Sequence, residues 1–459
     1  MRDLVVFALF VGLLPTCLLR PWIGVLCFSF LAYNRTQDLT WGFARGLPIA
    51  QSVAIAMIVG WMMFEYRPIR FRDIRIQAMV VLLLCVGISI AVNPVNWNIQ
   101  SRRYTELCKV IFVALLTGTL TIDRRRLRQI LMVVAIGFGF YGAKNGLAYF
   151  LLGTKTIIGP GGMLKDNNDF ALAMVMNLPF LWYLSYDVKD VRIGGMPIGQ
   201  ALKWGMRAVF ATTMITIIGT GSRGAFLATG AVVGWMVMKT RFKIPALFGA
   251  LVLGIIAFNL APQEYKDRMT SMFKTDVTEL DQSAQGRLVS WAVAGNMIQG
   301  NPFFGIGFQR MLFEYHHYTE GVEFPPGYNA EMARVAHNSY LQIWAESGSF
   351  AYLSFMFMLL STIFFCWRIS RRALGTDDEW VVWYARSIEC TLIAFVIGAT
   401  FLNRAHFDLV YQLVAVATAI PAVMAYERAH RKDGRRRPGV PARHVEVRSQ
   451  GALLGGPRR

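Results

Sequence analysis

Long apolar runs alternate with short polar segments along most of the chain. The runs have roughly the 17 to 25 residues that a helix needs to cross a bilayer. The first run is broken around Arg20-Pro21, so the pattern predicts about twelve spans if this stretch is one unit and about thirteen if it is two. The predicted spans are residues 3–33, 47–65, 77–92, 104–121, 127–152, 167–186, 202–219, 224–239, 244–260, 341–367, 384–402 and 407–427.

One polar interruption, residues 261–339, is far longer than the other connections. Its roughly 80 residues exceed what two adjacent helices need, and loops of that length are usually functional. Within it, residues 285–298 have apolar positions at helical spacing, and Asn301-Pro302 ends that pattern. We therefore expect a single membrane domain over residues 1–427, with short helices in the loop.

Composition supports a membrane protein, because 55% of the residues are hydrophobic and only 16% are charged. The net charge of +19 invites a nucleic-acid interpretation. However, the basic residues lie mainly in short connections between apolar runs, which is typical of cytoplasmic loops. The tail, residues 428–459, is rich in Arg, Gly and Pro, so we expect it to be disordered and held near anionic membrane lipid. No nucleic-acid partner is expected.

The basic connections also predict sidedness. Each pair of consecutive basic connections encloses an even number of predicted spans, so all of them can lie in the cytoplasm. The other connections then face outward, and they are residues 153–166, 219–224, 261–339 and 403–406.

Two arginines at the outer side are candidate anion ligands. Arg223 lies in a small-residue break, where glycines on either side allow another group to approach the backbone. Arg287 lies near the start of the predicted loop helix, whose free N–H groups attract anions, and Trp291 follows one turn later. Each has a simpler interpretation: Arg223 can reach lipid headgroups, and Arg287 can be an ordinary exposed helical arginine.

His337 is the candidate general base, because it lies where the loop re-enters the membrane and histidine titrates near neutral pH. Asn338 and Tyr340 can orient His337 or a substrate. On the same outer side, Lys165 and Asn168 precede a predicted span, where they can contact sugar or phosphate or belong to a helix cap.

A metal site is not expected. His316 and His317 have acidic residues nearby, but their spacing fits no metal motif. No cofactor motif is present, and the chain has no nucleotide-binding Gly-x-x-x-x-Gly-Lys-Ser/Thr sequence.

These motifs resemble those of the O-antigen ligase and polymerase family of bacterial envelope glycosyltransferases. The resemblance rests on their order around one large outer loop. The residues that carry it are Ser222-Arg223-Gly224, Arg287, Trp291, Pro302, Gly305, Gly307, His337-Asn338, Leu341 and Gly348. The opening, from Met1-Arg2-Asp3-Leu4 to Leu39-Thr40-Trp41-Gly42-Phe43, is similar to a subgroup of O-glycosylation ligases associated with exosortase systems.

The resemblance implies an all-α, GT-C-like membrane glycosyltransferase of the bacterial inner membrane, with its active site facing the periplasm. Such an enzyme transfers a glycan from undecaprenyl pyrophosphate to a sugar hydroxyl of lipid A-core, without metal and with inversion. Arg223 and Arg287 would stabilise the pyrophosphate, and His337 would accept or position the acceptor proton. A polymerase or a protein O-oligosaccharyltransferase of the same family, and a lipid or solute transporter, remain alternatives.

Overall fold

The computed structural model describes residues 2–35, 42–94, 97–153, 157–189, 191–260, 263–270 and 282–432. Residues 39–41 of the N-terminal motif lie outside this description. So do residues 261–262 and 271–281 of the long loop and the tail after residue 432.

Every predicted span coincides with a helix, and the first predicted span is two helices. The helices that contain these spans are α1 (Arg2–Leu19), α2 (Pro21–Asn34), α3 (Ile49–Phe64), α4 (Ile74–Val92), α5 (Trp97–Leu120), α6 (Arg124–Leu152), α7 (Asn167–Asp187), α8 (Gly199–Thr220), α9 (Arg223–Met238), α10 (Lys243–Leu260), α14 (Ser339–Ala373), α15 (Trp380–Gly398) and α16 (Asp408–Lys432).

Short polar side chains set where several helices begin. Asp123 caps α6 by accepting from the Arg126 N–H at 2.9 Å. Ser222 caps α9 in the same way. Each cap satisfies an N–H that has no partner within the helix. Pro21 opens α2, since proline is tolerated at the first helical position, and the predicted break there is confirmed.

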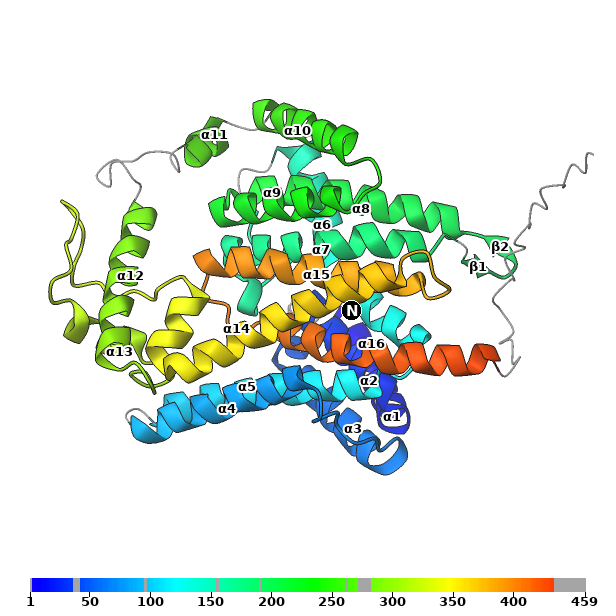
Figure 1. Ribbon diagram of the computed structural model, residues 1–459, viewed down its shortest axis with the longest axis horizontal. Coiled ribbons are helices and arrows are strands. Elements are labelled where there is room, and N and C mark those ends of the chain that lie inside the picture. Colours follow the sequence, from blue (N-terminus) through cyan, green and yellow to red (C-terminus); the bar gives the residue numbers. More distant parts are fainter. Residues whose placement is uncertain are drawn as a thin grey trace, which may run out of the picture.

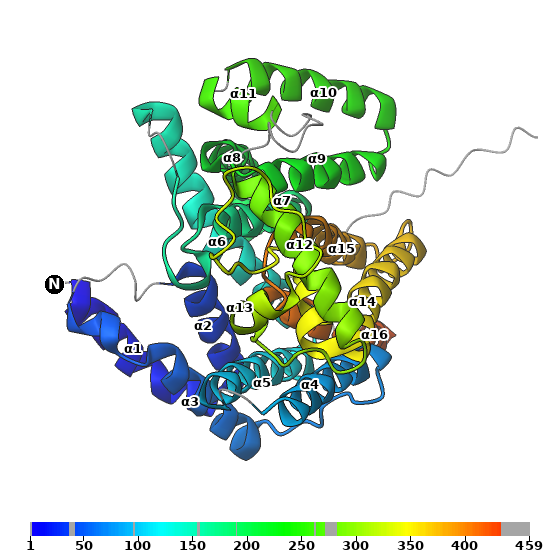
Figure 2. The ribbon, with the colours of Figure 1, turned by 90° about the vertical axis from the view of Figure 1, so that its left-hand side faces the viewer.

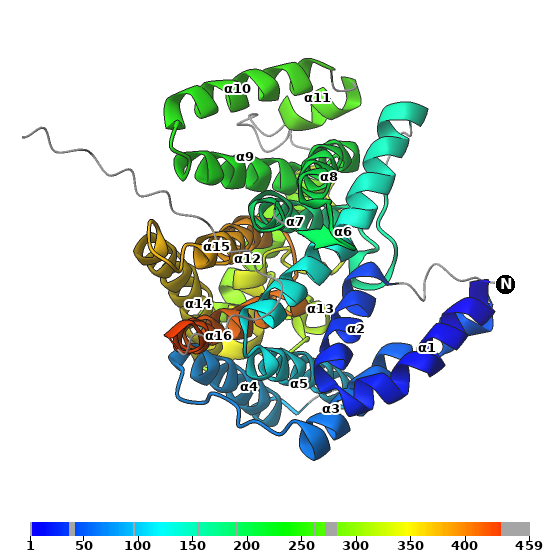
Figure 3. The ribbon, with the colours of Figure 1, turned by 90° about the vertical axis from the view of Figure 1, so that its right-hand side faces the viewer.

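The helices form an elongated bundle that runs along the horizontal axis of Figure 1. The interior helices are α15 and α16: α15 packs between α7 and α14, and α16 packs against α5. Outside them, α4 covers α14, α9 covers α15, and α8 lies against α6 and α7. In Figure 3, α1 to α3 lie at one side of the bundle and α10 at the top.

One end of the bundle carries ion pairs between segments that the charge pattern assigns to the same side. At this end, Arg124 pairs with Asp187 at 2.8 Å, and Arg126 pairs with Glu65 at 2.6 Å. These pairs join the ends of α3 and α7 to the start of α6. The long loop lies at the opposite end, on the left of Figure 1. Which end faces the periplasm stays a prediction.

Within the residues that the structure describes, six helices are long and apolar enough to span a membrane: α4, α6, α8, α14, the stretch Trp380–Phe401, and α16. Several shorter apolar helices accompany them, so the count of about twelve spans stays a prediction. Large apolar side chains on α14 are exposed at a helical repeat. They are Phe350, Leu353, Phe357, Leu360 and Phe364. An exposed apolar stripe of this length is typical of a lipid-facing helix.

The long loop contains α11 (Gln263–Thr270), α12 (Gln282–Gly300), α13 (Met311–Glu314) and the 3-10 helix η6 (Tyr315–Tyr318). The helix predicted over residues 285–298 is therefore confirmed, and it is longer than predicted. Helices α12 and α13 lie in front of the bundle end in Figure 2. A small antiparallel hairpin, β1 (Arg192–Ile193) with β2 (Met196–Pro197), departs from the all-α prediction. Its turn residues Gly194 and Gly195 have positive φ, which glycine adopts without strain.

Candidate functional site

His337 immediately precedes Asn338, the residue that caps the start of α14. The Asn338 side chain accepts from the N–H groups of Tyr340 and Leu341 at 3.0 and 3.2 Å, and so fixes the start of the helix. His337 has φ of +46°, a left-handed conformation that costs a non-glycine residue about 1 kcal/mol. Because its side chain is exposed, the imidazole can meet a substrate.

Trp291 holds the chain on the other side of His337. Its indole N–H donates to the carbonyl of Ala336 at 2.7 Å, and Ala336 is completely buried. This bond joins α12 to the residue that precedes His337. Since Arg287 lies one turn before Trp291 on α12, the same bond holds the helix turn that carries Arg287 near His337.

The charges around His337 favour its neutral form. The pKa of His337 is lowered, first because the protein shields the imidazole from water and then because the guanidinium of Arg287 repels a second positive charge. Arg334 and Arg404 add to this effect, and Asp166 opposes it. A neutral imidazole can accept a proton, which is the property that a general base requires.

Arg334 lies directly on the start of α12. A methyl group at position 286 would be only 2.5 Å from Nη1 of Arg334, so Gly286 provides the space for that guanidinium. Arg334 also lies 5.3 Å from the centre of the Tyr328 ring. Arg287 and Arg334 are therefore held close to the same helix start.

Arg404 joins three helix ends. Its guanidinium pairs with Asp169 in the first turn of α7. Its backbone N–H donates to the hydroxyl of Ser339 at 2.8 Å, and that hydroxyl donates to the carbonyl of Leu402 at 2.6 Å. The starts of α7 and α14 are thus fixed to the connection between α15 and α16.

Arg223 is the first residue of α9, at the same end of the bundle. Its neighbour Gly224 packs on Phe401, since a methyl group at position 224 would lie 3.0 Å from Phe401 Cβ. Asn167 donates to the carbonyl of Thr220 at 2.9 Å and so joins the start of α7 to the end of α8. These contacts link Arg223 to the connection that carries Arg404.

The remaining predicted site residues have well-defined local roles. The Asn168 N–H and carboxamide both donate to Asp166, which caps α7, while the Lys165 side chain is exposed. Tyr340 donates its hydroxyl to the carbonyl of Val396 at 2.7 Å, which joins α14 to α15. Contacts of Asn338, Tyr340, Lys165 and Asn168 with a substrate stay predictions.

Three glycines of the predicted motif form one junction between the loop and α14. Helix α14 bends at Gly348, where φ is +80°, and a methyl group there would lie 2.0 Å from the carbonyl oxygen of Phe303. The N–H of Ile306 and the N–H of Gly307 donate to carbonyls of α14 at 2.9 and 3.1 Å. Gly305 permits this approach, because a side chain there would meet the backbone of α14. The bend leaves carbonyls of α14 without their usual helical partners, and the turn around Gly305 and Gly307 provides N–H donors for them.

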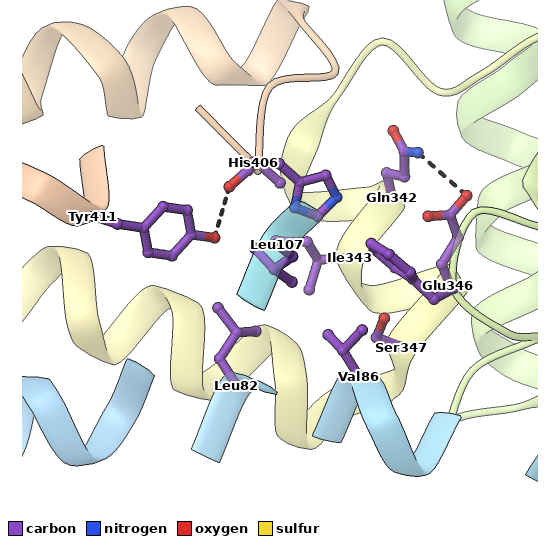
Figure 4. A pocket seen from close by; sticks show the side chains of 11 residues that line it. Leu82, Val86, Leu107, Gln342, Ile343, Glu346, Ser347, His406 and Tyr411 are labelled. Carbon is purple, nitrogen blue, oxygen red and sulfur yellow. Dashed lines mark hydrogen bonds between the residues drawn. The ribbon is translucent and has the colours of Figure 1, made fainter. Parts of the chain in front are cut away.

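A small cavity lies behind this junction (Figure 4). Buried Glu346 lines it and accepts from the Met311 N–H and from Gln342, both at 3.2 Å. His406 lies across the cavity, and burial, together with nearby Arg404, lowers its pKa to about 4. These groups tie the loop to the bundle and are separate from His337.

Comparison with known protein families identifies the segment that contains these features. Residues 208–356 match the family model described as O-antigen ligase. Over this segment, about a third of the chain, the protein is similar to the O-antigen ligase family. The matched O-antigen ligase segment contains Arg223, Arg287, Trp291 and His337, and it supports a membrane transferase role of the ligase and polymerase type.

A second family model, described as a family of unknown function, matches residues 1–171. It includes the N-terminal motif, in which the carboxylate of Asp3 accepts from the N–H groups of Gly42 and Ala44 at 3.0 and 3.1 Å. Lys165 and Asn168 fall in this segment and outside the O-antigen ligase match. No curated protein matches the chain significantly.

The sequence did not point to Arg334 or Arg404 as site residues, whereas Asp169 belongs to the polar stretch 165–169 that opens a predicted span on the outer side. Arg334 precedes His337 by three positions, and Arg404 lies in a predicted outer connection. An arginine and a carboxylate at the ends of two apolar runs were a usable signal, because such groups are usually paired when they border a membrane.

Proposed function

We propose that this protein is an O-antigen ligase, which transfers a glycan from undecaprenyl pyrophosphate to a sugar hydroxyl of lipid A-core, without metal and with inversion at the anomeric carbon. The observation that carries the proposal is the arrangement around His337. A histidine with a lowered pKa lies beside Arg287, and both fall in the matched segment. Two lipid-linked substrates suit a multi-pass membrane protein, and we place the reaction at the periplasmic face of the inner membrane.

The arginines would stabilise the leaving group. As the bond between the sugar and the pyrophosphate breaks, negative charge grows on the bridging oxygen. A guanidinium carries a permanent charge and two parallel N–H donors, which match phosphate oxygens. Arg223 and Arg287 can therefore supply the charge that a divalent ion would otherwise supply. Losing one such donor costs about 3 to 4 kcal/mol, or about a hundredfold to a thousandfold in rate.

His337 would accept the proton of the acceptor hydroxyl. In the free protein, shielding from water and then the neighbouring guanidinium groups lower the pKa of His337 and favour its neutral form. Binding of the anionic donor would offset these positive charges, and the pKa of His337 would then rise. The imidazole would therefore become a stronger base only when the donor is in place.

Site variants in the presence of a chelator test this proposal. Purified protein is mixed with the lipid-linked glycan and lipid A-core, and the release of undecaprenyl pyrophosphate is measured with excess chelator. We expect full turnover for the wild-type protein and losses of at least about a hundredfold for Arg223→Lys, Arg287→Lys and His337→Ala. Turnover that needs an added divalent ion would refute the metal-free mechanism. Normal turnover of His337→Ala would remove the role of the imidazole.

A further inference from the structure

Two arginines near the outer end have a carboxylate partner in the described part of the chain. Arg310 pairs with Glu314, and Arg404 pairs with Asp169. Arg334 differs: among the described residues, no carboxylate lies within ion-pair distance of its guanidinium. The Nη2 atom has a weak contact with the sulfur of Met332 at 3.7 Å. Its Nε atom is buried and has no acceptor in the described part of the chain.

The position of Arg334 is fixed, even though no carboxylate of the described residues neutralises its charge. The side chain is half-buried between Gly286, where it takes the place of a side chain, and the Tyr328 ring. Burying a cation without a counter-ion is costly, so such a group is usually paired. A guanidinium held in this way has donors that an incoming anion can satisfy.

Arg334 also faces the proposed site. It lies on the start of the helix that carries Arg287, and both guanidinium groups act on His337. A pyrophosphate has enough oxygens to accept from two guanidinium groups at once, whereas the reacting hydroxyl of the acceptor carries no charge to match them.

We propose that Arg334 is a third anion-binding side chain of the site and contacts the pyrophosphate of the donor together with Arg287. This inference rests on the proposed function. It assigns Arg334 to donor binding, and it leaves the acceptor and the proton transfer to other residues.

Binding of undecaprenyl pyrophosphate tests the inference without requiring turnover. The full-length protein is placed in lipid nanodiscs, and the Kd for undecaprenyl pyrophosphate is compared with that for undecaprenol, which has no phosphate. We expect Arg334→Gln to weaken binding of the pyrophosphate at least about tenfold and Arg334→Lys to weaken it less. Binding of undecaprenol should not change.

Arg371 provides a matched control. It also lies over an aromatic ring, 5.0 Å from the centre of Trp367, but near the C-terminal end of α14. Arg371→Gln removes the same charge and should leave binding of the pyrophosphate unchanged. Equal weakening in both variants would indicate an effect of net charge and would overturn the inference.

The acidic side of the pH–activity profile gives a second, independent readout. Arg287, Arg404 and Asp166 are the other charged groups that act on His337. With Arg334 removed, the imidazole should become easier to protonate, and the acidic limb should move to higher pH.

The outcomes separate the two proposals. If the wild-type protein binds the pyrophosphate and Arg334→Gln binds it equally well, Arg334 is not a ligand and the proposed function still stands. If the wild-type protein does not distinguish the pyrophosphate from undecaprenol, both proposals fail.

Discussion

The bond between Trp291 and Ala336 gives the sharpest test of how His337 is positioned. Trp291→Phe keeps an aromatic ring on α12 but removes the N–H that donates to the Ala336 carbonyl at 2.7 Å. Ala336 is completely buried, so water cannot easily replace the lost donor. A buried acceptor without a partner costs about 1–3 kcal/mol. If that cost appears in the transition state, kcat falls about fivefold to more than a hundredfold.

The assay is steady-state transfer with saturating donor, together with the Tm of the purified protein. We expect a lower kcat with little change in the KM for the donor, because the arginines remain in place. Trp61→Phe is the control, since the Trp61 indole also donates to a backbone carbonyl, that of Arg67 at 3.2 Å, but at an exposed position after α3. An unchanged kcat in Trp291→Phe, or an equal loss in Trp61→Phe, would refute the positioning role.

Two further predictions follow from the glycine junction and from the charges around His337. Gly348→Ala should prevent stable folding, because the backbone strain of about 1–3 kcal/mol adds to a contact of 2.0 Å with Phe303; Gly375→Ala, also at positive φ but with open space around it, should lower the Tm only slightly. Equal Tm values for the two variants would contradict this account. Arg287→Gln should raise the pKa of His337 and move the acidic limb of the pH–activity profile to higher pH, since protonation inactivates a general base. An unmoved limb would show that Arg287 does not act on the imidazole.

The helices and their order could be predicted because each follows from a local pattern. An apolar run of sufficient length predicts a span, and Arg20-Pro21 predicts a break within one. The same applies to the helix in the loop, which begins and ends near the predicted residues. The sequence also predicts which connections share an end of the bundle, because the basic residues lie in alternate connections.

The composition of the site could be predicted only in part. His337, Arg287 and Arg223 stand out because polar residues interrupt apolar patterns there. Arg334 and Arg404 come into the neighbourhood of His337 through packing between distant segments, which no local pattern encodes. The bond from Trp291 to Ala336 is of the same kind, since it joins residues far apart in the chain.

The bend of α14 shows the same limit. The sequence predicts one apolar run over residues 341–367, and the helix continues through it. The backbone leaves the helical conformation at Gly348 because carbonyls of α14 bond to the turn around Gly305 and Gly307. Predicting that bend would require knowing that the turn packs against α14.

The most direct test of the central claim is to identify the product formed by the purified full-length protein. Undecaprenyl-pyrophosphate-linked glycan and lipid A-core are incubated with the protein and excess chelator, and the lipids are separated and weighed by mass spectrometry. We expect the wild-type protein to produce lipid A-core that has gained the glycan, and the His337→Ala variant to form no such product. Longer lipid-linked glycan beside unmodified lipid A-core would show a polymerase, and the absence of any covalent product would contradict a transferase altogether.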